Sequence, residues 1–590
     1  MKVVLTTLHA KYIHASLALP CLKAATTDSK GIRSVIREFT VNEPRSDVLR
    51  RLVAEEADVV AFSCYIWNIE SISRIASDLK KLRPETLLVA GGPEVSYSAV
   101  EFLRDNCAFD CVICGEGEKT WQEFLLLLKN ERAVPLPAQA IPAGIAYRSA
   151  AAIEPARPRE AIANLDDIPS PFAMELVDTT KPLVYYETSR GCPFSCAFCL
   201  SSLEQGVRSF SLERIRADIR YLIEKQVRVV KLVDRTFNYD AARADEIWNF
   251  ILDHNKTSTF HFEIAADLLT DSNIRTLSRV PDGMFRFEIG VQATGQETLS
   301  RVARKSDTDQ LLTMVKRLTT ETGVTVHLDL VAGLPGEDFA GFLTSLGRLF
   351  PVAPHHIQIE PLKVLKGSPM AAIAVREGYA FSATPPYTIL RTPALSFDEI
   401  GHIEEISRLL DLYLNSGRFC RSLAALENQL PLADYFDRMA HFTKKQPGSG
   451  QTSLKGLFEQ MWHFGRDILD PEATSAFRDA LSYDFCLGEY PTTGILPSFF
   501  AEDWQKIRDS LPRQTIEAIL SNVEKPSGSR VRTFTAAFRK DYRTTPATAG
   551  PVDLVFVYVA TPGQGLRVEV FSPPPPATAK QIAAQVQQQP

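Results

Sequence analysis

The sequence predicts an α/β protein with two successive strand-and-helix domains and a mostly helical region after them. Short apolar runs end in glycine or polar turns, and amphipathic stretches at helical spacing lie between these runs. After about residue 385 the helical periodicity continues almost alone. At 590 residues, of which 45% are hydrophobic and 23% charged, the chain is long enough to build several cores.

The first series of strands and helices covers residues 1–135. Its apolar runs are MKVVLTT, ADVVAFSCY, TLLVAGGPE and FDCVICGEGE, and the helical stretches beside them include ESISRIASDLKKLRP and KTWQEFLLLLKN. This alternation predicts a Rossmann-like, doubly wound parallel sheet, which binds ligands at the carboxyl ends of its strands. The residues that we expect at those ends are Ser63, Tyr65, Gly91, Gly92, Gly115 and Gly117.

The second series covers residues 181–385 and follows a linker, rich in Pro and Ala, at residues 136–180. Its apolar runs are PLVYYETS, VRVVKLVD, TFHFEIAAD, MFRFEIGVQ, VTVHLDLVAGLP and HHIQIEPLKVL. Six strand-and-helix units predict a (βα)6 partial TIM-type barrel with its chemistry at the C-terminal strand ends. We expect a helical domain at 386–545, then a possible hairpin and a disordered, low-complexity tail at 546–590.

Three cysteines lie close together just after the first strand of the second series. Cys192, Cys196 and Cys199 have the spacing C-x3-C-x2-C, in a loop that also contains Gly191 and Pro193. Thiolates are the ligands of iron–sulfur clusters, and a loop allows three side chains to converge. Three protein ligands would leave one iron open. The alternative is a structural zinc site whose fourth ligand is a distant Cys or His.

The same spacing occurs a second time, at Cys107, Cys111 and Cys114. Here the last two cysteines fall in a predicted strand, where residues three apart point to opposite faces of the sheet. Buried cysteine is also a common small apolar residue. The local structure therefore disfavours a second cluster, although the sequence leaves a metal role for this set open.

The first cysteine set, with Phe198 before its last cysteine, resembles the motif of the radical S-adenosylmethionine (SAM) superfamily. The segments at residues 288–307, 327–338 and 357–370 resemble the later strands of that barrel. The resemblance implies a [4Fe-4S] cluster held by Cys192, Cys196 and Cys199. Its open iron would chelate SAM, and Phe198 would pack beside SAM.

The superfamily usually carries Gly-Gly-Glu after the second barrel strand, but this chain has VDRTFN at residues 233–238, as cobalamin-dependent members do. The SAM contacts that the resemblance suggests are Asp234, Glu263, Glu288 and Gln292. For the last three, the alternative is an ordinary polar residue of the barrel interior whose hydrogen bonds are satisfied within the protein.

Residues 1–135 resemble the cobalamin (B12)-binding domain that precedes many radical SAM barrels. The sequence Asp-x-His-x-x-Gly, which supplies a histidine to cobalt in other cobalamin domains, does not occur here. The resemblance therefore implies cobalt without a protein histidine. The glycines at the strand ends would let the backbone approach the corrin. The opening residues and the helical tail resemble an uncharacterised branch with a DUF4080-type C-terminal domain.

The resemblance implies an enzyme that cleaves SAM to a 5′-deoxyadenosyl radical and methylates an unactivated carbon of an unknown substrate. One alternative keeps both cofactors but catalyses an oxidative cyclisation or a rearrangement. A further alternative is a non-catalytic cobalamin or redox sensor. The implied partners are a small-molecule substrate and an electron donor such as flavodoxin or ferredoxin.

Composition sets further expectations about partners and location. The net charge of −6 and the lack of a basic, aromatic-interleaved stripe give no support for a nucleic-acid partner. No apolar run is long enough for a membrane span, and the first residues do not read as an export signal. Clustered cysteines favour reduced thiols. We expect a cytoplasmic protein, and an oxygen-sensitive cluster implies anaerobic metabolism.

Overall fold

The computed structural model describes residues 1–130, 140–149, 151–204, 206–444, 453–491, 496–500, 513–544, 546–563 and 565–573. The chain divides into two compact units, Met1–Glu404 and Glu405–Pro590. Among the described residues, no helix has the length and apolar character that a membrane crossing requires.

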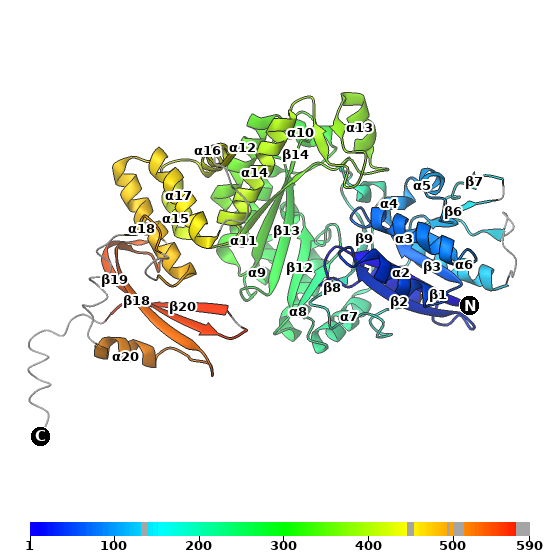
Figure 1. Cartoon of the computed structure of the whole chain (residues 1–590), viewed down its shortest axis with the longest axis horizontal. Helices are drawn as coiled ribbons and strands as arrows, with labels where there is room; N and C mark the ends of the chain where they lie inside the picture. Colours follow the sequence, from blue (N-terminus) through cyan, green and yellow to red (C-terminus); the bar gives the residue numbers. More distant parts are fainter. Residues whose placement is uncertain are drawn as a thin grey trace, which may run out of the picture. The chain divides into compact units, whose positions relative to one another are not determined.

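The first sheet of the N-terminal unit has seven strands in the order β2-β1-β3-β4-β5-β6-β7. Figure 1 draws this part of the chain in blue to cyan. Five are parallel: β1 (Lys2–His9), β2 (Arg33–Thr40), β3 (Val59–Ser63), β4 (Leu87–Gly91) and β5 (Cys111–Ile113). β6 (Ile145–Arg148) and β7 (Ile153–Glu154) add antiparallel. The helices are α1 (Ala18–Ala24), α2 (Arg45–Val53), α3 (Ile69–Leu82), α4 (Pro93–Ser96), α5 (Ala99–Asp105) and α6 (Gly117–Asn130).

Each face of this sheet has its own apolar core, which confirms the doubly wound prediction. One core joins alternate strand residues such as Phe62 to Ile72 of α3 and Phe102 of α5. The other joins the intervening strand residues to α1 and to Trp121 and Phe124 of α6. Because neighbouring strand residues point to opposite faces, short apolar runs feed both cores at once.

Three features of this sheet differ from the sequence expectations. Strand β2 and helix α2 were not predicted, because the segment RSVIREFT carries Arg33, Arg37 and Glu38 and forms the edge of the sheet, so its apolar run is short. The linker predicted at 136–180 is corrected, since it contributes β6 and β7 to the first sheet. Its Pro- and Ala-rich composition concealed two strands of only four and two residues.

The second sheet has six parallel strands in the order β15-β14-β13-β12-β11-β8, which confirms the (βα)6 partial barrel. The strands are β8 (Leu183–Tyr186), β11 (Val229–Leu232), β12 (Thr259–Ile264), β13 (Phe285–Gln292), β14 (Thr325–Ala332) and β15 (His356–Pro361). The helices between and after them are α7 (Leu212–Glu224), α8 (Ala241–His254), α9 (Asp271–Leu277), α10 (Gln296–Arg301), α11 (Thr308–Glu321), α12 (Phe339–Leu349) and α13 (Pro369–Glu377).

Side chains alternate strictly along the strands of the second sheet. In β12, Phe260 and Phe262 are fully buried, whereas His261 and Glu263 between them are only half-buried. The ring of Phe262 packs against Trp248 of α8 and against the ring of Phe260. One face therefore forms the apolar core under the helices, and the other is a polar inner face.

Short ribbons complete the N-terminal unit: β9 (Ser189–Cys192) pairs with β10 (Gly206–Ser209), and β16 (Ala380–Phe381) with β17 (Ile389–Arg391). Helix α14 (Phe397–Tyr413) follows.

The C-terminal unit contains a sheet as well as helices. Its helices are α15 (Cys420–Glu427), α16 (Leu432–Lys444), α17 (Leu454–Ile468), α18 (Pro471–Gly488) and α20 (Arg513–Ser521). The hairpin expected after residue 546 is present as β19 (Thr548–Thr561) and β20 (Gly565–Phe571). A third strand, β18 (Arg530–Asp541), was not expected within the helical domain predicted at 386–545. The predicted disordered tail lies mostly outside the described residues, which end at 573.

Candidate functional site

The cysteine loop follows the C-terminal end of β8, the position predicted for the chemistry of the barrel. Its first cysteine, Cys192, ends the short strand β9 rather than lying in an open loop. Gly191 has φ 92°, and a Cβ at this position would lie 2.1 Å from the carbonyl oxygen of Gly206. Only glycine fits so close to the partner strand, so the ribbon fixes the start of the loop.

The three thiols lie near one another. Cys192 and Cys199 both act electrostatically on Cys196, and the amide of Cys199 donates to the carbonyl of Cys196 over 3.0 Å. Cys196 is buried, whereas the other two thiols are half-buried. The Sγ of Cys192 and the Oγ1 of Thr236 lie 3.5 Å apart.

The barrel holds the middle of the loop from two sides. The amide of Ala197 donates to the carbonyl of Val302 (2.8 Å), and the amide of Met370 donates to the carbonyl of Ala197 (2.9 Å). Phe198, the expected neighbour of SAM, is half-buried beside them; its contact with SAM stays a prediction.

Arg304 is a functional residue that the sequence indicated only as part of a motif. Its Nη1 donates to the Sγ of Cys196 over 3.5 Å, its Nη2 donates to the carbonyl of Gly290, and its guanidinium lies 5.6 Å from the ring centroid of Phe194. Burial raises the pKa of Cys196, and the Arg304 charge opposes that rise. Three thiols of one loop, with a fixed cation at the middle one, fit an anionic iron–sulfur cluster.

The second cysteine set lies in a different environment. Cys111 belongs to the apolar core on one face of the first sheet, and Cys114 packs against the core on the other face. Cys107 is exposed. Burial raises the pKa of Cys114 to about 11. The prediction that these thiols point to opposite faces is confirmed.

Asp234 is fully buried, and its carboxylate accepts hydrogen bonds from neighbouring protein groups. It accepts hydrogen bonds from the amide and hydroxyl of Thr188 and from the hydroxyl of Ser189. Burial raises its pKa, and these donors oppose the rise. Asp234 thus anchors the strand that leads into the cysteine loop. A contact between Asp234 and SAM stays a prediction. The three hydrogen bonds make this contact less favourable, because protein donors already occupy the carboxylate.

Glu288 and Glu263 lie on the polar inner face of the barrel. Glu288 accepts from the Nε2 of His261 (2.8 Å) and from the Nζ of Lys231 (2.9 Å). The His261 hydrogen bond and the Lys231 charge outweigh burial and lower the pKa of Glu288 to about 2. Glu263 is 3.9 Å from the same lysine, and burial raises its pKa. Glu288 therefore has hydrogen-bond partners within the protein, as expected of an ordinary polar residue of the barrel interior. A contact with SAM stays a prediction for both Glu288 and Glu263.

Gln292 stands at the C-terminal end of β13, where the pairing with β14 shifts register. Its φ of 71° is in the left-handed region, which is uncommon for a residue with a side chain. Its Nε2 lies over Gly290, where a Cβ would come within 2.1 Å of that atom. Backbone strain of this kind is often found at functional sites. The contact between Gln292 and SAM stays a prediction.

Asp329 is a further polar residue of the inner face that the sequence reasoning did not single out. It is paired in register with Gly290 of β13 and Gln358 of β15. Its Oδ1 is buried without a hydrogen-bond partner among the described residues. Burial and the charges of Glu288 and Glu263 raise its pKa well above the usual value. The sequence HLDLVAGLP already indicated that Asp329 faces the barrel interior, because it alternates with the buried residues Leu328 and Leu330.

The carboxyl ends of the first sheet bring together the residues predicted there. Ser63 ends β3, and two residues later the Tyr65 ring stacks on Trp67 at 4.4 Å between centroids. At Gly92, φ is 109° and a Cβ would lie 2.5 Å from the Cys64 carbonyl oxygen. Gly91 ends β4, Gly117 begins α6, and a Cβ at Gly115 would meet nothing within 4 Å. This open, glycine-lined rim fits a large planar ligand; the individual contacts stay predictions.

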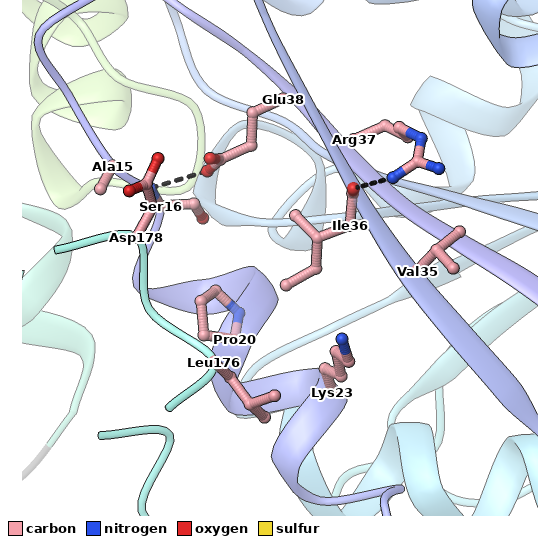
Figure 2. A pocket seen from close by; sticks show the side chains of 10 residues that line it. All are labelled: Ala15, Ser16, Pro20, Lys23, Val35, Ile36, Arg37, Glu38, Leu176 and Asp178. Carbon is pink, nitrogen blue, oxygen red and sulfur yellow. Dashed lines mark hydrogen bonds between the residues drawn. The ribbon is translucent and has the colours of Figure 1, made fainter. Parts of the chain in front are cut away.

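Two features of the first βα loop lie beside this rim. The Nδ1 of His14 and the hydroxyl of Tyr185 of β8 are 2.7 Å apart, and their rings stack. A cavity of about 280 Å³ lies against β2. Figure 2 shows the side chains that line it and the hydrogen bond from the Ser16 amide to Glu38. None of the predicted cobalamin or SAM contacts lines this cavity.

Three family models match successive parts of the chain. The model described as the B12 binding domain matches residues 3–125, the radical SAM superfamily model matches residues 186–348, and the model described as a protein of unknown function (DUF4080) matches residues 377–544. Their order agrees with the two α/β domains and the C-terminal region described above.

Two curated relatives are methyltransferases. The 2-(S-pantetheinyl)-carbapenam-3-carboxylate methyltransferase of Streptantibioticus cattleyicolor is 27% identical over 70% of this chain and 65% of its own length. The cobalamin-dependent radical SAM methyltransferase TokK of Streptomyces tokunonensis is 25% identical over 67% of this chain and 60% of its own length. The matched region thus spans less than two thirds of either relative.

A solved structure has the same fold. It is the radical SAM methyltransferase TsrM of Kitasatospora setae, with cobalamin and a [4Fe-4S] cluster bound. Its TM-score is 0.55 at 15% identity, over 75% of this chain and 99% of that chain.

Proposed function

We propose that this chain is a cobalamin-dependent radical SAM enzyme that methylates an unactivated carbon, because successive parts of it match the B12 binding domain, radical SAM superfamily and DUF4080 models. The substrate is a small molecule whose identity is unknown. The observation that carries this proposal is the position of the loop with Cys192, Cys196 and Cys199 at the C-terminal strand ends of the barrel, with Arg304 bound to the Cys196 thiol.

The protein's contribution is to hold and orient its cofactors. Cys192, Cys196 and Cys199 would hold a [4Fe-4S] cluster, and the glycine-lined rim of the first sheet would hold cobalamin. When bound, the cluster supplies the electron that cleaves SAM to methionine and a 5′-deoxyadenosyl radical, and cobalamin carries the methyl group. Lys231, Glu288 and Asp329 line the polar inner face on which SAM and substrate would be oriented.

A reduced cluster requires an electron donor, and we propose a flavodoxin or ferredoxin for this role. A cytoplasmic location is part of the same proposal. All ten cysteines are free thiols in the structure, which suits a reducing compartment.

Product analysis under anaerobic conditions tests the proposed reaction. The protein is reconstituted with iron, sulfide and methylcobalamin, reduced, and given SAM, and both products are quantified by mass spectrometry. With a methyl-accepting substrate present and over many turnovers, methylation predicts 5′-deoxyadenosine and S-adenosylhomocysteine in equal amounts, because each turnover cleaves one SAM and a second SAM restores the methyl group of cobalamin. 5′-Deoxyadenosine alone would indicate the cyclase or rearrangement alternative. Neither product, from protein with intact cofactors, would favour the sensor.

A further inference from the structure

A turn of the cobalamin-binding domain contacts the ribbon that carries the first cluster cysteine. Gly115-Glu116-Gly117-Glu118 leads into α6. Arg190, on β9, donates through Nη2 to Glu118 Oε1 (2.6 Å) and through Nη1 to Glu116 Oε1 (3.3 Å). Arg208, on β10, donates through Nη2 to the same Glu116 oxygen (2.8 Å). Two acidic residues of one domain thus bind two arginines of the other.

The two arginines lie directly opposite each other across the ribbon, since Arg208 pairs with Arg190 in the antiparallel register. Like charges at opposed positions destabilise a strand pair. Glu116 accepts from both, so it offsets the repulsion that the ribbon would otherwise suffer. Glu187 of the barrel domain also accepts from Arg190, and Glu204 lies 3.8 Å from Arg208, so the turn of the cobalamin-binding domain completes a charge compensation that the barrel domain supplies only in part.

The contact is largely shielded from water. The side chains of Arg190 and Glu116 are each 13% exposed, and that of Glu118 is 9% exposed. Arg190 also donates through Nε to Glu187 (3.0 Å). Multiple charge-assisted bonds to a planar guanidinium fix its position more closely than one surface ion pair does.

Both ends of this network reach a predicted cofactor site. Arg190 precedes the cluster ligand Cys192 by two residues on the same strand. Glu116 stands between Gly115 and Gly117, which are predicted to approach the corrin. A cofactor that orders the turn therefore also fixes the arginines, and a fixed ribbon loses less conformational entropy when SAM binds.

We propose that Arg190, Arg208, Glu116 and Glu118 are positioning residues that couple the cobalamin site to the cluster and SAM site, so that bound cobalamin tightens SAM binding. This inference rests on the proposed function, because it requires both ligands to bind. Coupling between binding sites is reciprocal, so SAM tightens cobalamin binding by the same factor.

The test measures SAM affinity in the protein with its cluster reconstituted, with and without hydroxocobalamin. SAM binding is followed by the change that it causes in the electron paramagnetic resonance spectrum of the reduced cluster. We expect cobalamin to tighten SAM binding about tenfold in the wild type. In Glu116→Gln/Glu118→Gln the ratio should fall to within about twofold of unity, with cluster content and cobalamin stoichiometry retained.

Two further variants keep the test interpretable. Glu123→Gln removes a carboxylate on the same helix that binds Arg159 through two 2.7 Å bonds, away from the cluster ribbon, and should keep the wild-type ratio. Arg190→Lys keeps the charge but loses the planar fork, and should give an intermediate ratio. A wild-type ratio retained in Glu116→Gln/Glu118→Gln, or a ratio of one in the wild type, overturns the inference alone. Failure of the wild type to bind SAM and cobalamin overturns the proposed function with it.

Discussion

The guanidinium of Arg304 lies against the most buried of the three cluster cysteines, with its Nη1 3.5 Å from the Sγ of Cys196. Stacking over Phe194 and the hydrogen bond to the Gly290 carbonyl hold it in place. A fixed positive charge at this distance stabilises an anionic ligand set, and most of all its reduced form.

Replacing Arg304 by Gln should lower the reduction potential of the cluster. One electron added to the cluster increases its negative charge, so the loss of a neighbouring cation makes reduction less favourable. Redox titration followed by electron paramagnetic resonance measures this shift. Arg301→Gln is the control, because Arg301 pairs with Glu377 rather than with a cysteine. A potential unchanged in Arg304→Gln would contradict the assigned role.

Alanine at Cys192, Cys196 or Cys199 should abolish the bound iron and sulfide. Each thiol supplies one of only three protein ligands, and the remaining pair cannot hold a cubane cluster. Cys107→Ala is the matched control, since its thiol has the same motif spacing but is exposed and apart from Cys111. Iron and sulfide analysis after reconstitution gives the result. Loss of half the iron in Cys107→Ala would indicate a second cluster and refute the present interpretation.

The ion pair between Lys231 and Glu288 should contribute to the stability of the barrel. A double-mutant cycle with Lys231→Met and Glu288→Gln should give a coupling free energy of about 1–2 kcal/mol, because both groups are largely removed from water. The more exposed pair Lys363–Glu360 is the control, with an expected coupling below about 0.5 kcal/mol. Equal coupling for the two pairs in urea denaturation would show that burial does not strengthen the inner pair.

Ionisation of Glu337 should make the folded protein less stable as pH rises from about 4.5 to about 7. Burial raises its pKa from 4.5 to about 7, and one of its carboxylate oxygens has no partner among the described residues. Between pH 4.5 and 7 the folded chain binds more protons here than the unfolded chain does, so this residue's contribution to stability falls as pH rises and is constant above about 7.

Glu337→Gln removes this contribution, since an amide does not ionise and can still accept from the hydroxyl of Ser345. The variant should gain stability relative to the wild type as pH rises, by up to about 3 kcal/mol between pH 4 and 8. Denaturant unfolding at several pH values provides the comparison. A difference between variant and wild type that does not change with pH would exclude ionisation of Glu337 as its cause.

The sequence predicted the parts of the fold whose apolar runs end in glycine or polar turns. All six barrel strands were identified in this way, whereas β2 was missed because it is an edge strand with charged residues at 33, 37 and 38. The spacing of Cys192, Cys196 and Cys199 predicted the cluster ligands, and the strand position of Cys111 distinguished the second set from them.

Contacts between residues far apart in the chain could not be predicted from the sequence. Arg190 and Glu116 are 74 residues apart, and a single chain carries no signal that pairs them. The same holds for Arg304 and Cys196, which are 108 residues apart. Glu288 was predicted to contact SAM, but its hydrogen bonds to Lys231 and His261 become visible only when three strands lie side by side.

The measurement that tests the central claim most directly is anaerobic formation of 5′-deoxyadenosine from SAM by the reduced, reconstituted protein. The account predicts its formation by the wild type and by Cys107→Ala, and its loss in the variant with alanine at Cys192, Cys196 and Cys199. Formation by that triple variant at the wild-type rate, or its absence from wild-type protein with a full cluster, bound cobalamin and bound SAM, would contradict the claim that this loop carries radical SAM chemistry.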